Sequence, residues 1–239
     1  MATKINQINQ IHLTLKKSAD SNIAAHSQRF FKTGKGEYGE GDIFLGIRVP
    51  VLRKMAKQYK ELSVDQILEV LTSKYHEERL LALLMLVNSY EKADLNNQKI
   101  IYTHYLNNTR FINNWDLVDS SAHKIVGAYL YTKNRKPLYT LARSKDLWER
   151  RIAIISTYYF IKKRDFEDTL KICELLIDNK EDLIHKAVGW MLREIGNQDM
   201  STERAFLDKY YKTMPRTMLR YAIEKFPEQL RQDYLKGKL

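Results

Sequence analysis

The chain has 239 residues, of which 44% are hydrophobic and 29% are charged, and this balance allows a sizeable core and excludes disordered and fibrous proteins. Lys and Arg outnumber Asp and Glu by 40 to 29, and the net charge of +11 favours a polyanionic partner such as nucleic acid, with a solvated basic surface as the alternative. A single cysteine excludes an internal disulfide framework, and the six scattered histidines show no metal-ligand spacing.

The N-terminal segment, residues 1–10, is polar and lacks the apolar stretch of a signal peptide. Nowhere in the chain do about 18 apolar residues follow one another, so we expect no membrane-spanning segment. These observations predict a cytoplasmic protein that has no membrane partner and uses no metal.

A glycine-rich segment follows, because five of the nine glycines fall between Gly34 and Gly46. This clustering predicts one long loop in a chain that is otherwise free to be helical. The sequence Gly34-Lys35-Gly36 lacks the Gly-Lys-Ser/Thr ending and the preceding strand of a phosphate-binding loop, so nucleotide binding is not expected.

After this loop, apolar residues recur at helical spacing, and alternation of the β type over comparable lengths is hard to find. The runs are Val64-Ile67-Leu68-Leu71, Leu80-Leu83-Leu84-Val87 and Ile152-Ile155-Tyr159. The predicted fold class is therefore all-α.

An internal repeat is also present, in which a charged start precedes an apolar helix that contains an alanine. These alanines are Ala82, Ala122, Ala153, Ala187 and Ala222, which are 40, 31, 34 and 35 residues apart. That period suits a pair of antiparallel helices, and stacked pairs would form a continuous core. We predict one HEAT-like repeat domain over residues 1–239, a solenoid of antiparallel helix pairs, with an ordinary helical bundle as the alternative.

The same segments carry basic residues near their starts, namely Arg79, Arg150, Arg151, Lys186, Arg216 and Arg220. Stacking would align these residues on one side, where side-chain charge and unpaired amides at helix N-termini attract phosphates. The pattern predicts a concave basic groove for duplex DNA. Alternatively, each arginine pairs with a neighbouring acid such as Glu78 or Glu149 on a solvated helix face, which is the more common case for any single one.

The segment from Asn114 to Asp119 holds the first candidate for chemistry, because Asn114 can cap a helix that begins with Trp115. Trp115 and Asp119 are four residues apart, which places a ring and a carboxylate on one helix face near an N-terminus that favours the ionised acid. Such a pair can stabilise a cationic, sugar-like transition state in glycosidic cleavage. The simpler alternative is a packed tryptophan and a favourable helix-dipole interaction.

Three residues in the C-terminal half are interpreted from their apolar surroundings. Trp148 and Cys173 lie in apolar helical segments and are expected in the core. Gly189 lies inside an apolar helix, where glycine costs about 1 kcal/mol relative to alanine, so we expect a close helix contact or room for a ligand. Trp190 would then have one free face.

Four motifs follow one another along the chain. They are residues 44–50 (FLGIRVP), 114–119 (NWDLVD), 148–153 (WERRIA) and 186–194 (KAVGWMLRE). These motifs resemble those of the AlkD-like DNA alkylation repair family. Their order and separations are similar to the family pattern over nearly the whole chain. The resemblance implies a HEAT-like solenoid that holds duplex DNA on its concave face and acts, without a cofactor, as a monofunctional glycosylase on purines alkylated at a ring nitrogen.

The resemblance also assigns roles to individual residues. Asp119 matches the family's catalytic carboxylate, which stabilises the developing sugar cation and orients the attacking water. Trp115 and Trp190 match the paired aromatics that contact the deoxyribose and add cation–π stabilisation. Arg151 matches the arginine that holds the DNA backbone near the lesion. Further DNA contacts are expected from Arg48, Arg53, Arg150 and Lys186.

The resemblance further implies an N-terminal helix that enters the minor groove, and residues 24–32 are expected to form it before a loop over residues 33–42. Its Phe30 and Phe31 are alternatively core anchors, the interpretation that residue type favours. A non-catalytic DNA-binding paralogue and a protein-interaction solenoid remain open as alternative functions. We expect a monomer.

Overall fold

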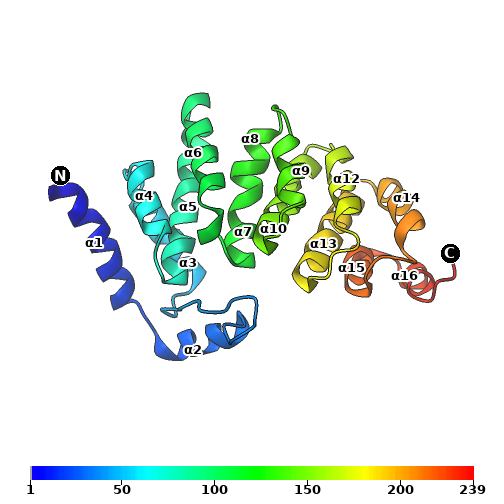
Figure 1. Cartoon of the computed structure of the whole chain (residues 1–239), viewed down its shortest axis with the longest axis horizontal. Coiled ribbons are helices and arrows are strands. Elements are labelled where there is room, and N and C mark those ends of the chain that lie inside the picture. Colours follow the sequence, from blue (N-terminus) through cyan, green and yellow to red (C-terminus); the bar gives the residue numbers. More distant parts are fainter. Residues whose placement is uncertain (1) are drawn as a thin grey trace. The chain divides into compact units, whose positions relative to one another are not determined.

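The computed structural model describes the backbone of residues 2–239 and the side chains of residues 7–239. Within these residues every regular element is helical, apart from one isolated bridge between Ile43 and Tyr75 (Figure 1). The prediction of an all-α fold is therefore confirmed. No helix of the described part combines the length and the apolar character that crossing a bilayer requires.

The chain divides into two compact units, Met1–Ser121 and Ala122–Leu239. The predicted single repeat domain over residues 1–239 stays a prediction. The helices that begin in the first unit are α1 (Ala2–Lys17), α2 (Ser21–Phe30), α3 (Val49–Gln58), α4 (Val64–Leu71), α5 (His76–Lys92), α6 (Leu95–Asn107), the 3-10 turn η1 (Thr109–Phe111) and α7 (Trp115–Ala122).

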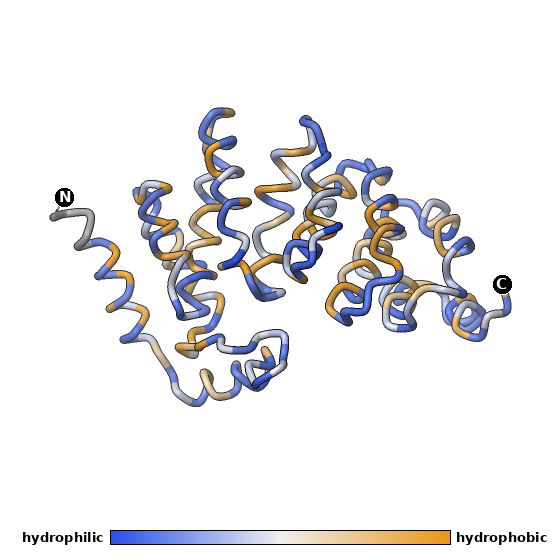
Figure 2. The backbone as a smooth tube through the Cα atoms, viewed as in Figure 1, coloured by the Kyte–Doolittle hydropathy of each residue, from blue (hydrophilic) through white to orange (hydrophobic). Residues whose placement is uncertain are grey.

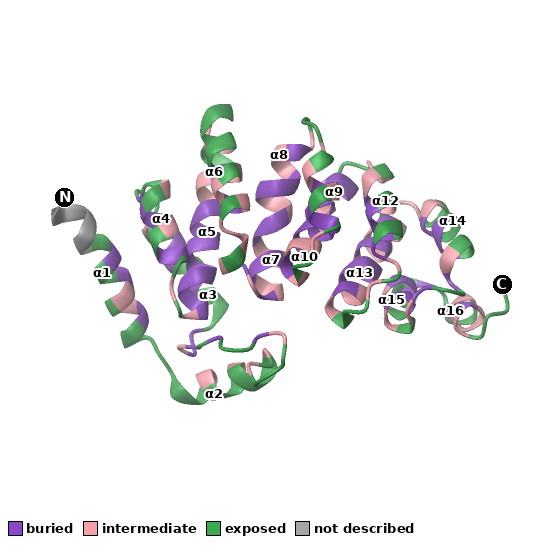
Figure 3. Ribbon diagram, in the orientation of Figure 1, coloured by how far each residue is buried: buried purple, intermediate pink, exposed green. Residues whose placement is uncertain are grey.

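The core of the first unit is built around α5, which is buried at every residue from His76 to Val87 (Figure 3). Helices α3 and α4 both pack against it. The start of α4 is fixed by a capping box, in which the Ser63 amide donates to Gln66 Oε1 at 3.0 Å and Ser63 Oγ accepts from the Gln66 amide. Because α5 is buried even in its first turn, the polar groups at its N-terminus need partners inside the protein.

Helix α2 lies outside this core and has no buried residue (Figure 3). The Asp20 side chain caps it by accepting from the amides of Asn22 and Ile23. Its start is fixed against Gly46, where a β-carbon would come within 2.0 Å of the Asp20 carbonyl oxygen. The predicted N-terminal helix is thus confirmed, with bounds Ser21–Phe30, and the predicted glycine-rich loop follows it.

The elements of the second unit are also helical. They are the π-helical turn η2 (His123–Gly127), α8 (Ala128–Leu130), α9 (Lys136–Ala142), α10 (Leu147–Ser156), α11 (Tyr158–Ile161), α12 (Glu167–Leu175), α13 (Asp182–Gln198), α14 (Met200–Tyr210), α15 (Arg216–Ala222), the 3-10 turn η3 (Ile223–Lys225) and α16 (Glu228–Leu235). Hydrophobic and hydrophilic residues are interspersed along these helices (Figure 2). An amphipathic helix has such a mixture because its apolar residues recur every three or four positions.

Helix α13 is the centre of this unit, because it packs against α10, α14 and α15. At Gly189 a β-carbon would come within 2.4 Å of the Met218 carbonyl oxygen and 2.5 Å of Tyr221 Cβ on α15. The close helix contact predicted at this glycine is confirmed. Trp148 and Cys173 are buried as predicted.

The five alanines of the internal repeat are each fully buried. They lie in α5, α7, α10, α13 and α15 respectively. A small side chain at these positions lets neighbouring helices approach closely. The repeat therefore marks the helices on which the cores of both units are built.

Candidate functional site

Helix α7 begins at Trp115, the residue predicted from the sequence. The buried Asn114 precedes it, and its Oδ1 accepts from the Trp115 amide at 2.9 Å. Its carbonyl accepts from the amide of Val118 at 3.2 Å and so starts the helical hydrogen-bond ladder. Asp116 carries the first of the motif's two carboxyl groups, and its Oδ1 accepts from the amide of Leu117 at 2.9 Å.

Trp115 and Asp119 are both half-buried and lie one turn apart on α7. The Trp115 ring stacks on Phe31 at 5.1 Å with an interplanar angle of 19°, and Phe30 meets it edge-on at 5.9 Å. The predicted arrangement of an aromatic ring and a carboxylate one turn apart is therefore present at the start of α7.

The Asp119 carboxylate also affects a neighbouring helix. Together with burial, it raises the pKa of Tyr105, whose hydroxyl lies 2.9 Å from Ser121 Oγ.

The two phenylalanines at the end of α2 differ in environment. Phe30 is 57% exposed, so its interpretation as a core anchor is wrong. Phe30 ends a helix that has no buried residue, and its ring meets the rings of His26, Phe31 and Trp115. Phe31 is half-buried, and its ring stacks on Phe44 at 4.9 Å as well as on Trp115.

Beneath this aromatic cluster lies a buried network that the sequence did not reveal. His76 Nδ1 is 2.7 Å from Asp42 Oδ2, and its Nε2 is 2.8 Å from Asp116 Oδ2. Arg79 Nη2 donates to the other oxygen of Asp42 at 2.6 Å. The three charged groups of Asp42, His76 and Arg79 are each at least 94% buried, so the network replaces their contacts with water.

The charges of this network stabilise one another. Burial alone would lower the pKa of His76, but the carboxylates of Asp116 and Asp42 raise it to about 9. Burial alone would likewise raise the pKa of Asp42, but His76 and Arg79 together hold it below its ordinary value. At neutral pH the imidazole is thus a cation between two carboxylates.

Arg79 requires a correction, since the sequence placed it among the basic residues of a DNA groove. It is 5% exposed, and besides Asp42 it donates to the Ser73 carbonyl oxygen at 3.1 Å. The suggested alternative, a pair with Glu78, is also wrong, because Glu78 lies 2.8 Å from His12 Nδ1. Arg48 and Arg53, at the start of α3, are exposed.

In the second unit, the expected DNA-contacting arginines lie on α10. Arg150 Nη1 donates to the carbonyl oxygens of Ser144 and Lys145 at 2.9 and 2.8 Å. Arg151 is buried and its Nη1 donates to the Leu183 carbonyl oxygen at 2.5 Å. This bond joins α10 to the first turn of α13, which carries the remaining predicted residues.

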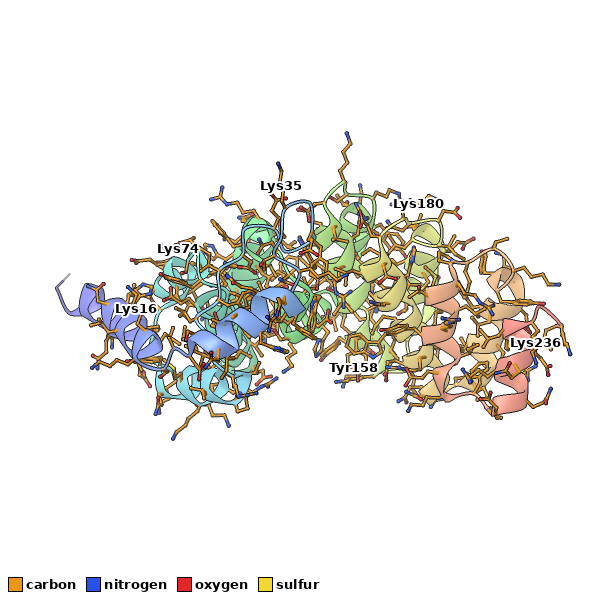
Figure 4. The ribbon with its side chains drawn as sticks, turned by 90° about the horizontal axis from the view of Figure 1, so that it is seen from below. Lys16, Lys35, Lys74, Tyr158, Lys180 and Lys236 are labelled. Atoms are coloured by element: carbon orange, nitrogen blue, oxygen red, sulfur yellow. The ribbon has the colours of Figure 1, made fainter. Side chains whose placement is uncertain are left out.

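Those residues are Lys186 and Trp190. Lys186 pairs with Asp182 at 2.8 Å on the surface of α13. Trp190 is half-buried, its Nε1 donates to Glu194 Oε1 at 2.9 Å, and its ring centroid is 5.8 Å from that of Tyr158, which is labelled in Figure 4. Burial and the nearby Glu194 carboxylate raise the pKa of Tyr158.

The structure therefore brings the predicted residues together in two groups. Trp115 and Asp119 share α7 in the first unit, and Arg151 lies against the helix of Trp190 in the second. Among the described side chains, no group of three His, Cys, Asp or Glu residues could hold a metal ion. The one signal for the buried network was the charged run from His76 to Arg79 directly before an apolar helix.

Comparison with known proteins adds three findings. A family model for DNA alkylation repair enzymes matches residues 11–226. A solved structure described as a predicted DNA alkylation repair enzyme from Enterococcus faecalis is similar with a TM-score of 0.68 and 15% identity over 88% of this chain and 98% of that one. The structure of AlkD2 from Streptococcus mutans is similar with a TM-score of 0.55 and 16% identity over 87% of this chain and 98% of that one.

No curated protein sequence was found to match. The two solved structures share the fold of this chain. Their sequence identities of 15% and 16% are too low to indicate a shared activity. The family model, by contrast, spans most of the sequence. The chain belongs to the DNA alkylation repair enzyme family.

Proposed function

We propose that this protein is a DNA glycosylase that hydrolyses the N-glycosidic bond of cationic alkylated purines in duplex DNA. The observation that carries the proposal is the half-buried Asp119 one turn after Trp115, at the start of α7. Family membership and the net charge of +11 support a DNA substrate. The proposed architecture is a HEAT-like solenoid with a concave basic groove, as the family resemblance implies.

The chemistry that this arrangement supports is stabilisation of a sugar cation. Alkylation at a ring nitrogen leaves the purine positively charged, so the base can depart without prior protonation. The Asp119 carboxylate then stabilises the oxocarbenium-like sugar electrostatically and orients the attacking water. Trp115 and Trp190 contact the deoxyribose, where a ring face contributes about 0.5 to 2 kcal/mol toward a developing cation. No cofactor takes part in this scheme.

DNA binding in this proposal depends on Arg48, Arg53, Arg150 and Lys186, and on Arg151. Arg151 is 5% exposed and would have to leave the Leu183 carbonyl oxygen to reach a phosphate. Arg48 and Arg53 are exposed, and their charges are available to phosphates. Each phosphate contact releases counterions, so the logarithm of the affinity falls linearly with the logarithm of salt concentration. An Arg53→Ala variant should weaken binding to all sequences about equally and reduce the salt slope by about 1.

A second candidate is a non-catalytic DNA-binding protein of the same family, and one contact favours it. Phe31 stacks on a face of Trp115, and Phe30 lies against the same ring. A deoxyribose that approached this face would have to displace Phe31. In such a protein the Asp119 carboxylate would be present, but Phe31 would occupy the face of the Trp115 ring that the sugar needs.

The deciding experiment is release of methylated purines from methylated duplex DNA by the purified protein. Wild type should release base faster than the spontaneous rate, and Asp119→Asn should reduce the single-turnover rate by about 100-fold or more, as expected for loss of a group that stabilises transition-state charge. The matched control is Asp178→Asn, an exposed aspartate on neither α7 nor α13, which should leave the rate unchanged.

Two outcomes would reject the glycosylase proposal. Wild type could bind DNA with a steep salt dependence and release no base above the spontaneous rate, which would identify the non-catalytic DNA-binding protein. Alternatively, it could show no salt-dependent affinity for DNA, which would favour a protein-interaction role.

A further inference from the structure

The imidazole of His76 bridges two carboxylates from different segments of the chain. Asp42 belongs to the glycine-rich segment and Asp116 to the first turn of α7. A neutral imidazole carries one N–H, so it could donate to only one of them, whereas the cation donates to both. With Arg79 bound to Asp42, the four groups carry two positive and two negative charges, which is a balanced set for a buried site.

His76 reaches the first turn of α7 by two routes. The first is the hydrogen bond to Asp116, which lies between Trp115 and Asp119 in sequence. The second is through aromatic rings, because His76 lies 5.1 Å from Phe31 and Phe31 stacks on Trp115. Both routes end on the first turn of α7, which contains Trp115 and directly precedes Asp119.

We propose that His76 is a positioning residue for base excision, whose imidazolium holds Asp116 and thereby keeps Trp115 and Asp119 in the geometry that the sugar cation requires. The inference rests on the glycosylase activity proposed above. His76 does not contact the substrate in this scheme. It acts through α7, and small displacements of positioned catalytic groups can reduce a rate by about 100-fold.

The two carboxylates would respond differently if His76 lost its proton. Asp42 keeps Arg79 at 2.6 Å and Asn114 Nδ2 at 3.4 Å. Asp116 keeps only the Leu117 amide among its hydrogen bonds, and its side chain is 15% exposed against 2% for Asp42. Deprotonation of His76 should therefore release Asp116, and with it the first turn of α7.

This asymmetry gives a pH dependence with a defined sign. The charged groups that face His76 are Asp42 from the glycine-rich segment and Asp116 from α7, with Arg79 of its own helix bound to Asp42. His76 titrates at about 9, so the excision rate should be constant near neutral pH and fall as the pH rises through 9. A variant without the imidazole should lack this alkaline decline.

The test compares His76→Gln with wild type in base release between pH 7 and pH 10, after subtraction of the spontaneous rate. At pH 7 we expect kcat to fall at least tenfold while KM changes by less than threefold, and the decline near pH 9 should disappear. The matched control is His12→Gln, which removes a histidine bound to the buried Glu78 without touching α7. Its kcat and its alkaline decline should be those of wild type.

A second measurement separates this inference from the glycosylase proposal. The chain has three tryptophans, so a Trp148→Phe, Trp190→Phe background leaves Trp115 as the sole indole emitter. Its fluorescence should change as the pH rises through 9, and this change should be absent after His76→Gln. If wild type releases no base but the fluorescence change depends on His76, the glycosylase proposal fails and the link from His76 to Trp115 stands.

The inference would be overturned by either of two results. One is a fluorescence transition that is absent, or is the same with and without the imidazole. The other is an active His76→Gln protein that keeps wild-type kcat and its decline near pH 9. Should His76→Gln fail to fold, Asp116→Ala removes the acceptor of the His76 Nε2–H from the more exposed side and should produce the same loss of kcat and of the alkaline decline.

Discussion

Asp42 in the first unit and Glu203 in the second are both buried, yet their carboxyl groups have opposite pKa shifts. As whole residues, Asp42 is 8% exposed and Glu203 is 1% exposed. The pKa of Asp42 is lowered, because His76 and Arg79 outweigh burial. The pKa of Glu203 is raised to about 8 by burial, which the charge of Arg193 only partly offsets.

The difference lies in the hydrogen bonds. Both oxygens of Asp42 have charged donors at 2.6 and 2.7 Å, whereas Oε1 of Glu203 has no hydrogen-bond partner. Glu203 fits beside Gly196, where even a β-carbon would come within 1.7 Å of its Oε2. Arg193, whose charge partly offsets the effect of burial, is bonded to Glu224 instead. A buried carboxyl group therefore stays ionised where the fold supplies donors and takes up a proton where it does not.

The largest expected effect is that of Asp42→Ala. This substitution leaves the His76 and Arg79 cations buried with fewer partners, and breaking a buried ion pair from one side costs about 3 to 5 kcal/mol. Urea unfolding followed by circular dichroism would measure the loss. A change below about 1 kcal/mol would show that the network contributes little to stability, and that the comparison with Glu203 has no energetic meaning.

Glu203→Gln should produce a smaller effect that depends on pH. The folded pKa of about 8 lies above the unfolded value of 4.5, so between these values the folded state binds more protons and its stability falls as the pH rises. From pH 5.5 to pH 7 the wild type should lose about 2 kcal/mol relative to Glu203→Gln, since each pH unit in the window costs about 1.4 kcal/mol.

Unfolding free energies of both proteins at the two pH values test this prediction. The groups that titrate in both proteins, His76 included, cancel in the difference. Identical pH dependence in the two proteins would mean that Glu203 is ionised in the folded state, and that an unrecognised donor stabilises it.

Neither the network around His76 nor the buried carboxyl group of Glu203 was predicted from the sequence. For the network the reason is physical. The partners of His76 lie 34 and 40 residues away in the chain, so no local spacing reveals them. Charged residues in the first turn of a helix ordinarily face solvent. At α5 the segment after Asp42 covers them, with the amides of Leu45, Gly46 and Ile47 donating to the Glu77 carboxylate.

Local features were predicted correctly where the cause is local. The start of α7 at Trp115 follows from the asparagine before it, and the close contact at Gly189 follows from a glycine in an apolar helix. Phe30 was misjudged because residue type favours burial, and the sequence does not show that α2 has no buried residue. The roles of Asp119, Trp115 and Trp190 stay predictions. They come from the family resemblance, because helix spacing alone does not assign a role to a residue.

The smallest effect is expected at a carboxylate that has donors but is exposed. Asp146 caps α10 by accepting from the amides of Trp148 and Glu149 at 2.7 and 3.0 Å. Asp146→Ala should cost about 1 kcal/mol, because water can satisfy the freed amides, and Asp146→Asn should restore nearly all of it since the amide oxygen accepts the same bonds. Urea unfolding of both variants tests this order. Asp146→Ala could instead destabilise the protein as much as Asp42→Ala. In that case, the accessibility of a carboxylate to water would not determine the free energy lost on its removal. The contrast between Asp42 and Glu203 would then need a different explanation.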